Sequence, residues 1–579
     1  MRMFIRPCYR KKNGKSHAYW ALVESYRTPR GSRQRVVAYL GQLEERKRRG
    51  VRQAAQGKAE PAQASLFSPA IEESALWVEV DAKQVRVENR RAFGAPWLGL
   101  ELAKRVGLDE FLRKTMDPGH ETVPWPLMAL VLTLSRLCHP SSELHIAEHF
   151  YRATAMEELL GVPAAAVNDD RLYRALDELL PHKDALESHL KNRLGTLFDL
   201  NYDLMLYDMT STYFEGEQLG NPLAQRGHSR DQRSDCKQVC IALVVSREGM
   251  PLGYQVFPGN TADSKTFQEI ITTIERKYGK AERIWVVDRG MVSEKNMNFL
   301  RQDGRRYIVG TPKSRLKRFE QYLVQENWST IREGLEVKLC ADPDGKETFI
   351  LCRSRDRQEK EKAMRARFME RIEKALQKMA AACQKKRIRR DTLAIRLGRI
   401  FARNSRAARL FEVEIHDREG GGVTLSWKQR SEWLAWATLS EGCYLLRSNI
   451  ADWSAEELWQ AYIQLTQAEA AFRIQKSDLR IRPIWHQKEE RVLAHLLVCF
   501  LAYVLWKTLG QMAKAAGLGD EPRRILDELG QISLIDVVLP TKAGIEIRRR
   551  CITRPTEHQA ILLQRLHLNL PLHLDTLDL

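Results

Sequence analysis

Residues 203–208 read Asp203-Leu-Met-Leu-Tyr-Asp208, a short apolar run that ends in an acid. Two further apolar runs follow, Gln238-Val-Cys-Ile-Ala-Leu-Val-Val-Ser and Pro251-Leu-Gly-Tyr-Gln-Val-Phe-Pro, joined by the turn Arg247-Glu-Gly-Met. Short apolar runs bounded by turn signals are typical of buried β-strands. This stretch therefore predicts three consecutive strands in antiparallel order.

Helices and strands alternate after this point. The pattern predicts a helix over about Ser264–Tyr278, the strand Arg283-Ile-Trp-Val-Val closing on Asp288, another helix, and the strand Tyr307-Ile-Val-Gly. Three antiparallel strands followed by parallel strands with crossover helices are the order of an RNase H-like sheet in an α/β fold. Asp208 and Asp288 would then end neighbouring strands at one edge, where a bound cation would offset the cost of placing acids there.

Each acid also has an ordinary explanation by itself. Asp208 could cap the next turn through Thr210 and Ser211, and Asp288 could pair with Arg289. Two acids at equivalent positions of one sheet favour the metal site over these separate explanations.

Residues 462–476, Tyr462-Ile-Gln-Leu-Thr-Gln-Ala-Glu-Ala-Ala-Phe-Arg-Ile-Gln-Lys476, predict one helix, because good helix formers run through them without Gly or Pro. Tyr462, Glu469 and Lys476 recur every seven residues, close to two turns, so a continuous helix would present them on one face. Arg473 follows Glu469 by four residues and would share that face. An acid among an aromatic ring and two cations suits a site for a metal ion and phosphates, although a surface helix with a Glu–Arg pair has the same pattern.

Composition and pattern divide the whole chain into segments. We expect a small basic β domain (1–44), a linker with a short β segment (45–94), a helical domain (95–199), the two parts of the RNase H-like core (200–312 and 441–515), a β-rich and helical insertion domain between them (313–440), and a basic C-terminal tail (516–579).

The composition favours a nucleic-acid partner. The 579 residues carry a net charge of +19, with 44% hydrophobic and 29% charged residues, as in a soluble globular protein that binds a polyanion. Ten scattered cysteines and an N-terminus without an apolar signal segment predict reduced thiols in the cytoplasm. The longest apolar run, Val492 to Trp506, is too short to span a bilayer, so we expect a buried helix and no membrane partner.

One motif suggests a different class of enzyme. His145-Ile-Ala-Glu148-His149 fits the His-x-x-Glu-His pattern, in which two histidines hold zinc and the acid acts as general base. No third ligand in a Glu-rich helix follows, and a plain amphipathic helix explains the pattern as well. A zinc peptidase remains the alternative outside nucleic-acid chemistry.

Four segments together resemble the DDE transposases of bacterial insertion sequences. They are Tyr207-Asp208-Met-Thr-Ser-Thr-Tyr-Phe-Glu, the stretch from Pro251 to Ser264, Val287-Asp288-Arg-Gly-Met, and Tyr462 through Lys476. The resemblance covers roughly residues 200–510. Within these transposases, the sequence most resembles the group that has a Tyr-x2-Arg-x3-Glu-x6-Lys signature and an insertion before the last acid. Leu465 stands where that signature has Arg, which removes one of the family's DNA contacts.

The resemblance implies that Asp208, Asp288 and Glu469 are the catalytic acids and hold two Mg²⁺ ions, or Mn²⁺ in their place, roughly 4 Å apart. One ion would activate water or a 3′-OH, and the other would stabilise the leaving oxygen. The implied reaction is cleavage at transposon ends and transfer of the 3′-OH ends into target DNA.

The resemblance also implies how DNA is held. Tyr462 and Lys476 would hold the DNA end, and the further candidate backbone contacts are Arg473, Arg289, Lys237 and His228. The implied partner is double-stranded DNA, bound by a homodimer at the bacterial nucleoid. A catalytically inactive DNA-binding protein of the same ancestry is the alternative within the family.

Overall fold

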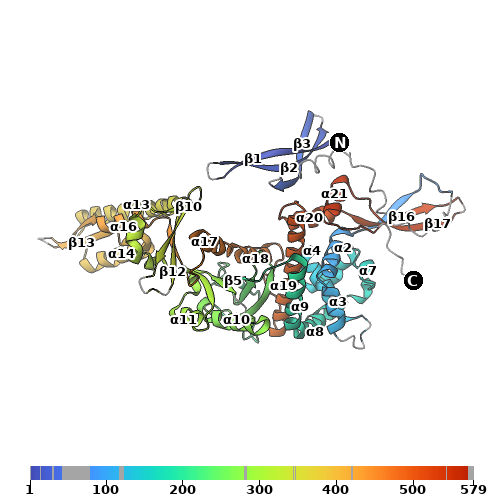
Figure 1. The fold of residues 1–579 in the computed structure, drawn as a ribbon, viewed down its shortest axis with the longest axis horizontal. Coiled ribbons are helices and arrows are strands. Elements are labelled where there is room, and N and C mark those ends of the chain that lie inside the picture. The colour runs from blue at the N-terminus through green and yellow to red at the C-terminus, as the bar shows by residue number, and fades with distance from the viewer. Residues whose placement is uncertain are drawn as a thin grey trace. The chain divides into compact units, whose positions relative to one another are not determined.

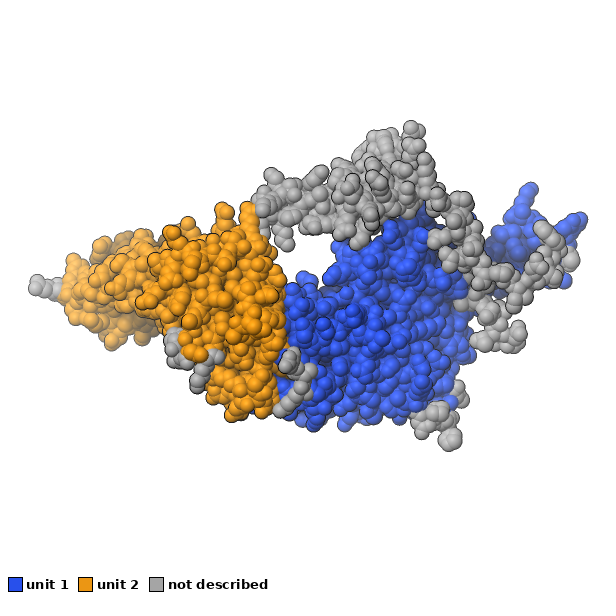
Figure 2. Space-filling view, in the orientation of Figure 1, with its two compact units in different colours: residues 1–283, 464–579 blue, residues 284–463 orange. Residues whose placement is uncertain are grey.

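The computed structural model describes residues 2–12, 15–28, 31–41, 79–116, 121, 123–279, 283–342, 345, 347–418, 421–542 and 544–571, with Val23 as the one described side chain before residue 79. The chain forms two compact units. Unit 1 comprises residues 1–283 and 464–579, and unit 2 comprises residues 284–463 (Figure 2).

The chain begins with a three-stranded antiparallel sheet. Its strands, in spatial order, are β1 (Arg2–Lys12), β2 (Lys15–Thr28) and β3 (Gly31–Gly41) (Figure 1). β2 and β3 are antiparallel and pair as far as Thr28 and Gly31.

A helical region of unit 1 follows. Its helices of eight residues or more are α2 (Gly94–Arg105), α3 (Leu108–Thr115), α4 (Trp125–Cys138), α8 (Asp169–Leu179) and α9 (Lys183–Phe198). Shorter turns of helix lie between α4 and α8, among them α5 (Glu143–His145), the π-helix η2 (Ile146–Phe150), α6 (Tyr151–Ala153) and α7 (Met156–Leu160). α4 is almost wholly buried and packs against α2, α8 and α19 (Glu489–Ala515).

The strands of unit 1 that follow confirm the first part of the expected core. β5 (Leu204–Tyr213), β6 (Gln238–Val245) and β7 (Pro251–Pro258) pair in antiparallel order, and α10 (Asp263–Tyr278) follows them. Every residue of β6 is buried, as its continuous apolar sequence predicts.

The longest apolar segment forms α19. By length and composition this 27-residue helix could cross a membrane, so the expectation that the run is too short was wrong. The apolar window is 94% buried inside the structure, as in the core helix of a globular unit, which confirms the buried helix.

The C-terminal segment is a folded part of unit 1 and not a tail. It contains α20 (Pro522–Leu529), β16 (Ser533–Pro540), β17 (Glu546–Ile552) and α21 (Glu557–Arg565). β16 pairs with β17 on one side and with β4 (Arg86–Ala92) on the other. The expectation of a tail was wrong because β4 and β16 are more than 400 residues apart, and local patterns do not reveal such a pairing.

Unit 2 contains the second part of the core sheet. β8 (Ile284–Val287) and β9 (Arg306–Thr311) are parallel and joined by α11 (Glu294–Gln302), as expected for the RNase H-like core. Strands of the insertion extend the sheet beyond β9 in the order β15 (Cys443–Ser448), β12 (Thr348–Ser354), β11 (Leu335–Ala341) and β10 (Ser329–Arg332), all antiparallel.

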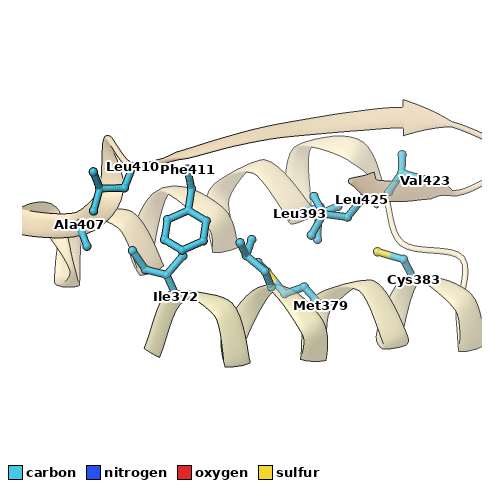
Figure 3. Close-up of a cluster of buried hydrophobic side chains, with 10 residues drawn as sticks. Ile372, Met379, Cys383, Leu393, Ala407, Leu410, Phe411, Val423 and Leu425 are labelled. Carbon is cyan, nitrogen blue, oxygen red and sulfur yellow. The ribbon is translucent and has the colours of Figure 1, made fainter. Parts of the chain in front are cut away.

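The rest of the insertion has a hydrophobic core of its own. This part of the insertion consists of α13 (Arg355–Lys385), α14 (Arg390–Arg403), α15 (Ser405–Ala408), the hairpin β13 (Phe411–Asp417) and β14 (Val423–Gln429), and α16 (Ser431–Ser440). Ile372 of α13, Leu393 of α14 and Phe411 of β13 belong to this buried cluster, and Figure 3 shows Ile372 on the side of α13 that faces Phe411. The basic run Lys385–Arg390 therefore joins two packed helices.

The helix expected over residues 462–476 is interrupted. Tyr462 lies in α17 (Ala455–Ile463), whereas Glu469 and Lys476 lie in α18 (Thr466–Ser477). The amides of Gln467 and Ala468 bond to carbonyls only three residues earlier, at 2.7 and 3.0 Å, which tightens the backbone at the break. The seven-residue spacing therefore does not place all three side chains on one helix face.

Candidate active site

Asp208 lies in the middle of β5 and not at its end, because the strand continues through Tyr213. Thr210 and Ser211 are buried strand residues, so the capped turn considered for Asp208 does not form. The Asp208 side chain is half-buried, and its Oδ1 accepts a hydrogen bond from the Met209 amide at 2.7 Å. The preceding Tyr207 is fully buried, with its hydroxyl 2.7 Å from the Thr266 hydroxyl of α10.

Glu469 lies in the first turn of α18 and is exposed. Ala468, Ala471 and Phe472 form the buried side of this helix, which packs against β5 and β6. Within unit 1, the helix of Glu469 thus lies on the strand of Asp208.

Asp288 belongs to unit 2 and directly follows β8, as expected. It is exposed, and its Oδ1 accepts a hydrogen bond from the Tyr462 hydroxyl at 3.5 Å. Burial, reinforced by the nearby Asp288 carboxylate, raises the pKa of Tyr462 above its ordinary value. Tyr462 is therefore a neutral hydrogen-bond donor at physiological pH.

Gly310 of β9 leaves the space that Tyr462 occupies. A Cβ at this position would lie 2.6 Å from the Tyr462 hydroxyl and 3.1 Å from the Arg289 backbone nitrogen. Sequence reasoning identified the strand ending in Gly310 but missed this role, since the contact depends on a helix more than 140 residues later in the chain.

Lys476 is paired with an acid that sequence reasoning also missed. Its Nζ lies 2.9 Å from Asp231 Oδ1, and Arg482 contacts the same oxygen. The Asp231 side chain is 5% exposed, and its Oδ2 is buried without a hydrogen-bond partner. Burial lowers the pKa of Lys476, while Asp231 opposes the shift.

The other candidate DNA contacts fall on both units. Arg473 is exposed on α18, and Arg289 is exposed directly after Asp288 in unit 2. His228 is exposed in the loop between β5 and β6, whereas the Lys237 amine donates to the Gln218 carbonyl at 3.3 Å. The structure thus leaves Arg473, Arg289 and His228 exposed and engages the Lys237 amine within the protein.

The same loop is fixed beside Asp208 by Arg230. Its guanidinium donates to the backbone carbonyl of Met209 and forms an ion pair with Asp263 of α10. This residue was not among those expected from the sequence, and nothing in its local pattern distinguishes it from other loop arginines.

The His-x-x-Glu-His motif does not form a three-ligand metal group within the described part of the chain. The rings of His145 and His149 lie 4.8 Å apart, and the motif runs into the π-helix η2, in which the α-helical spacing is lost. The group of ligand atoms that does converge within 4.8 Å comprises Glu143, His486 and His495.

That second group is a hydrogen-bonded network. His486 Nε2 lies 3.4 Å from Glu143 Oε1, while His495 faces Arg136 through Nδ1 at 3.4 Å and the Ile481 carbonyl through Nε2 at 3.2 Å. Burial opposes ionisation of Glu143, but the hydrogen bond and charge of His486 lower its pKa to about 2. Burial lowers the pKa of His495 well below its ordinary value, helped by the Arg136 charge, so His495 is neutral.

Comparison with known proteins gives two sequence-family matches. Residues 200–505, more than half of the chain, match the family described as "Transposase DDE domain". Residues 5–69 match "IS1634 family transposase, N-terminal domain". No curated protein matches the chain.

Among solved structures, the chain is similar to that titled "Cryo-EM structure of piggyBac transposase synaptic complex with hairpin DNA". The identity is 8% and the TM-score 0.36, over 79% of this chain and 82% of the other. A similarity at this level adds nothing to the assignment, which depends on the sequence-family matches.

The larger match contains all three candidate acids and the strands and helices that carry them. Enzymes with this domain have an RNase H-like core, catalyse phosphoryl transfer on DNA and generally use divalent metal ions. The chain belongs to the Transposase DDE domain family and is a DNA transposase of the insertion-sequence type.

Proposed function

We propose that this transposase cleaves DNA at transposon ends and joins the 3′-OH ends to target DNA, with Asp208, Asp288 and Glu469 as its metal ligands. The observation that carries the proposal is the packing of α18 on β5, because it places the helix of Glu469 on the strand of Asp208. Asp288 is the remaining acid of the matched domain that follows a core strand directly.

The donor set fits Mg²⁺, or Mn²⁺ in its place. All three groups are carboxylates, and Mg²⁺ prefers carboxylate oxygens and retains several waters. Asp288 and Glu469 are exposed and Asp208 is half-buried, so solvent reaches all three residues. Bound metal would supply Lewis-acid activation of the attacking oxygen and stabilisation of the leaving oxygen.

The protein's own side chains would orient the DNA. Lys476 would act as a point charge on a phosphate near Glu469 once it leaves Asp231. The neutral Tyr462 hydroxyl has one hydrogen, so it would hold the DNA end by transferring its donated bond from Asp288 to the DNA. Arg473, Arg289, Lys237 and His228 would add backbone contacts, of which Lys237 must first leave the Gln218 carbonyl.

The same proposal includes the assembly and its location. Joining two ends of one element to a target needs two sets of acids, so we expect a homodimer on double-stranded DNA. Its substrate would place the enzyme at the bacterial nucleoid.

The decisive experiment uses DNA that carries the inverted repeats flanking the gene, incubated with protein and Mg²⁺. Asp208→Asn, Asp288→Asn and Glu469→Gln should each reduce strand cleavage by about a thousandfold or more, because each removes one ligand charge from the metal site. Glu490→Gln, at an exposed acid on α19, is the matched control. Cleavage by Glu469→Gln at the wild-type rate would refute the proposed ligand set.

The experiment also addresses the alternative of an inactive DNA-binding protein. The wild type would then bind the end DNA yet release no product with Mg²⁺ or Mn²⁺. In that case the three substituted proteins would bind the end DNA as the wild type does and would likewise release no cleavage product.

A further inference from the structure

A cavity of about 430 Å³ opens in unit 1 between α4, α8, the start of α19 and the loop that joins α18 to α19. This volume falls within the range of small-ligand sites. None of the three candidate acids, Asp208, Asp288 and Glu469, lines it, so the cavity needs an explanation of its own.

The charge of the cavity wall favours an anionic ligand. Five cationic side chains line it, Arg136, Arg480, Arg482, Lys488 and Arg491, against the single acid Glu143. Glu143 is already engaged by His486. The wall therefore carries a large excess of positive charge in a partly enclosed space, where charges are less screened than on an open surface.

Two of these cations are available to a ligand. Arg482 is paired with Asp231, and Arg491 with Asp177 at 3.2 Å. Within the described ranges, neither Arg480 nor Lys488 has a carboxylate within 4.0 Å, and both are exposed at the rim.

An aromatic side chain lines the same cavity as these two cations. Trp485 is 66% exposed, the largest exposed aromatic side chain on the described surface of the protein. It follows the buried Ile484, which is anchored to β5 through hydrogen bonds to Tyr213 and Glu215 at 3.0 Å. An exposed indole that lines the same cavity as two cations without carboxylate partners suits a ligand that combines a flat ring with a phosphate.

The same anchor places the cavity relative to the candidate acids within unit 1. Ile484 bridges to Phe214, which directly follows β5 and lies six residues along the chain from Asp208. This corresponds to about 20 Å at about 3.3 Å per extended residue. On a DNA strand this distance spans roughly six nucleotides. A DNA strand held at Asp208 would therefore reach the cavity about six nucleotides away.

A metal ion on Glu143, His486 and His495 explains the cavity less well. Both ring nitrogens of His495 already face partners, and one of these is the Arg136 guanidinium, which would repel a cation. The network instead fixes Arg136, whose guanidinium also donates to the Arg480 carbonyl at 3.3 Å.

We propose that this cavity binds one nucleotide of the DNA substrate, with its phosphate on Arg480 and Lys488 and its base on Trp485. The inference rests on the proposed function for the identity of the ligand, and it adds a DNA subsite distinct from the three acids. Arg136 and the Glu143–His486 pair hold the wall in position behind it.

The test measures DNA binding without divalent metal, using a fluorescent single strand and a fluorescent duplex of mixed sequence over a range of salt concentrations. Arg480→Asn with Lys488→Gln removes both cations, and Asn tolerates the left-handed backbone of residue 480 at φ 45°. Lys104→Gln with Lys114→Gln makes the same charge change on α2 and α3, outside the cavity. Trp485→Ala removes the aromatic ring and Trp485→Phe retains one, so the two variants test whether a base stacks on this side chain.

Loss of this one phosphate contact should reduce the slope of log affinity against log salt by about 0.7 for the single strand and about 0.9 for the duplex. Trp485→Ala should weaken single-strand binding about tenfold, and Trp485→Phe should retain most of it. The control pair should leave both slopes near the wild-type values.

The proposal would be overturned if the salt-dependence slopes of the Arg480→Asn, Lys488→Gln double variant equalled those of the control double variant. It would also be overturned if purified wild-type protein held stoichiometric zinc and the Glu143→Gln variant did not. If wild-type protein cleaves end DNA while the cavity variants bind like the control, the subsite fails and the proposed function stands. Binding is measured without metal, so absence of cleavage by the wild type would count against the proposed function and not against the subsite.

Discussion

Lys476 and Asp231 form an ion pair with Nζ 2.9 Å from Oδ1, with side chains that are only 13% and 5% exposed. The pair links α18 to the loop between β5 and β6, and Arg482 joins it from the loop that follows α18. A residue expected to hold DNA is thus neutralised inside the protein before DNA arrives.

Asp231→Ala should destabilise the protein, because it leaves Lys476 and Arg482 close together without a counter-charge. We expect the free energy of unfolding to fall by about 3 kcal/mol, measured by urea denaturation. Combining it with Lys476→Ala should cost less than the sum of the two single changes. If the losses of unfolding free energy in the two single variants added up to the loss in the double variant, the contact between Asp231 and Lys476 would contribute nothing to stability.

Gly310→Ala should disturb Tyr462, since the added methyl would lie 2.6 Å from its hydroxyl. Overpacking of this kind costs about 1–3 kcal/mol. Tyr462→Phe removes the clashing oxygen and should restore part of the stability lost in Gly310→Ala, in a thermal-unfolding comparison of the two single variants and the double variant. Rescue should be incomplete, because the methyl also approaches the Arg289 backbone nitrogen. If Gly310→Ala lowered the stability equally in the wild-type and the Tyr462→Phe proteins, the Tyr462 hydroxyl would not be the source of the strain.

Leu465→Arg restores the residue type of the family signature, yet we expect it to harm this protein. Leu465 is 7% exposed at the start of α18, so an arginine there would bury an unpaired charge. The free energy of unfolding should fall by about 2 kcal/mol or more, whereas Leu465→Met should cost less than about 1.5 kcal/mol. Tighter DNA binding with unchanged stability would show instead that the arginine reaches the surface.

Glu143 should give the protein a specific sensitivity to acid. Its pKa of about 2 in the folded state lies below the ordinary value of 4.5, so the unfolded chain binds more protons between these values. The stabilisation is complete above about pH 4.5 and is lost as the pH falls towards 2, by at most about 3 kcal/mol. Urea unfolding over this range should show a shallower pH dependence for Glu143→Gln. Identical slopes for both proteins would exclude the His486 pair as the cause.

The strand order was predictable from the sequence because buried strands have continuous apolar runs. β6 and β8 are entirely buried, and their sequences contain little that is polar. The position of Asp208 within β5 was not predictable in the same way. Thr210, Ser211 and Thr212 are common turn residues, and only their packing against neighbouring strands makes them part of a buried strand.

The acids of the candidate site were identifiable from their order along the chain and from the family resemblance. Their surroundings were not, because Asp231 and Gly310 meet Lys476 and Tyr462 only through tertiary structure. The break between α17 and α18 was equally hidden, since no Gly or Pro marks it.

The division into units has a consequence for synthesis of the chain on the ribosome. Unit 2 is one continuous segment, residues 284–463, whereas unit 1 is completed only by residues from 464 onward (Figure 2). Domains generally fold as they emerge, N-terminal parts first. The nascent sheet of β5, β6 and β7 must therefore wait for the whole of unit 2 before α18 and α19 can cover it. During that interval its apolar surface is exposed, and the transposase is most vulnerable to aggregation before its last 116 residues have left the ribosome.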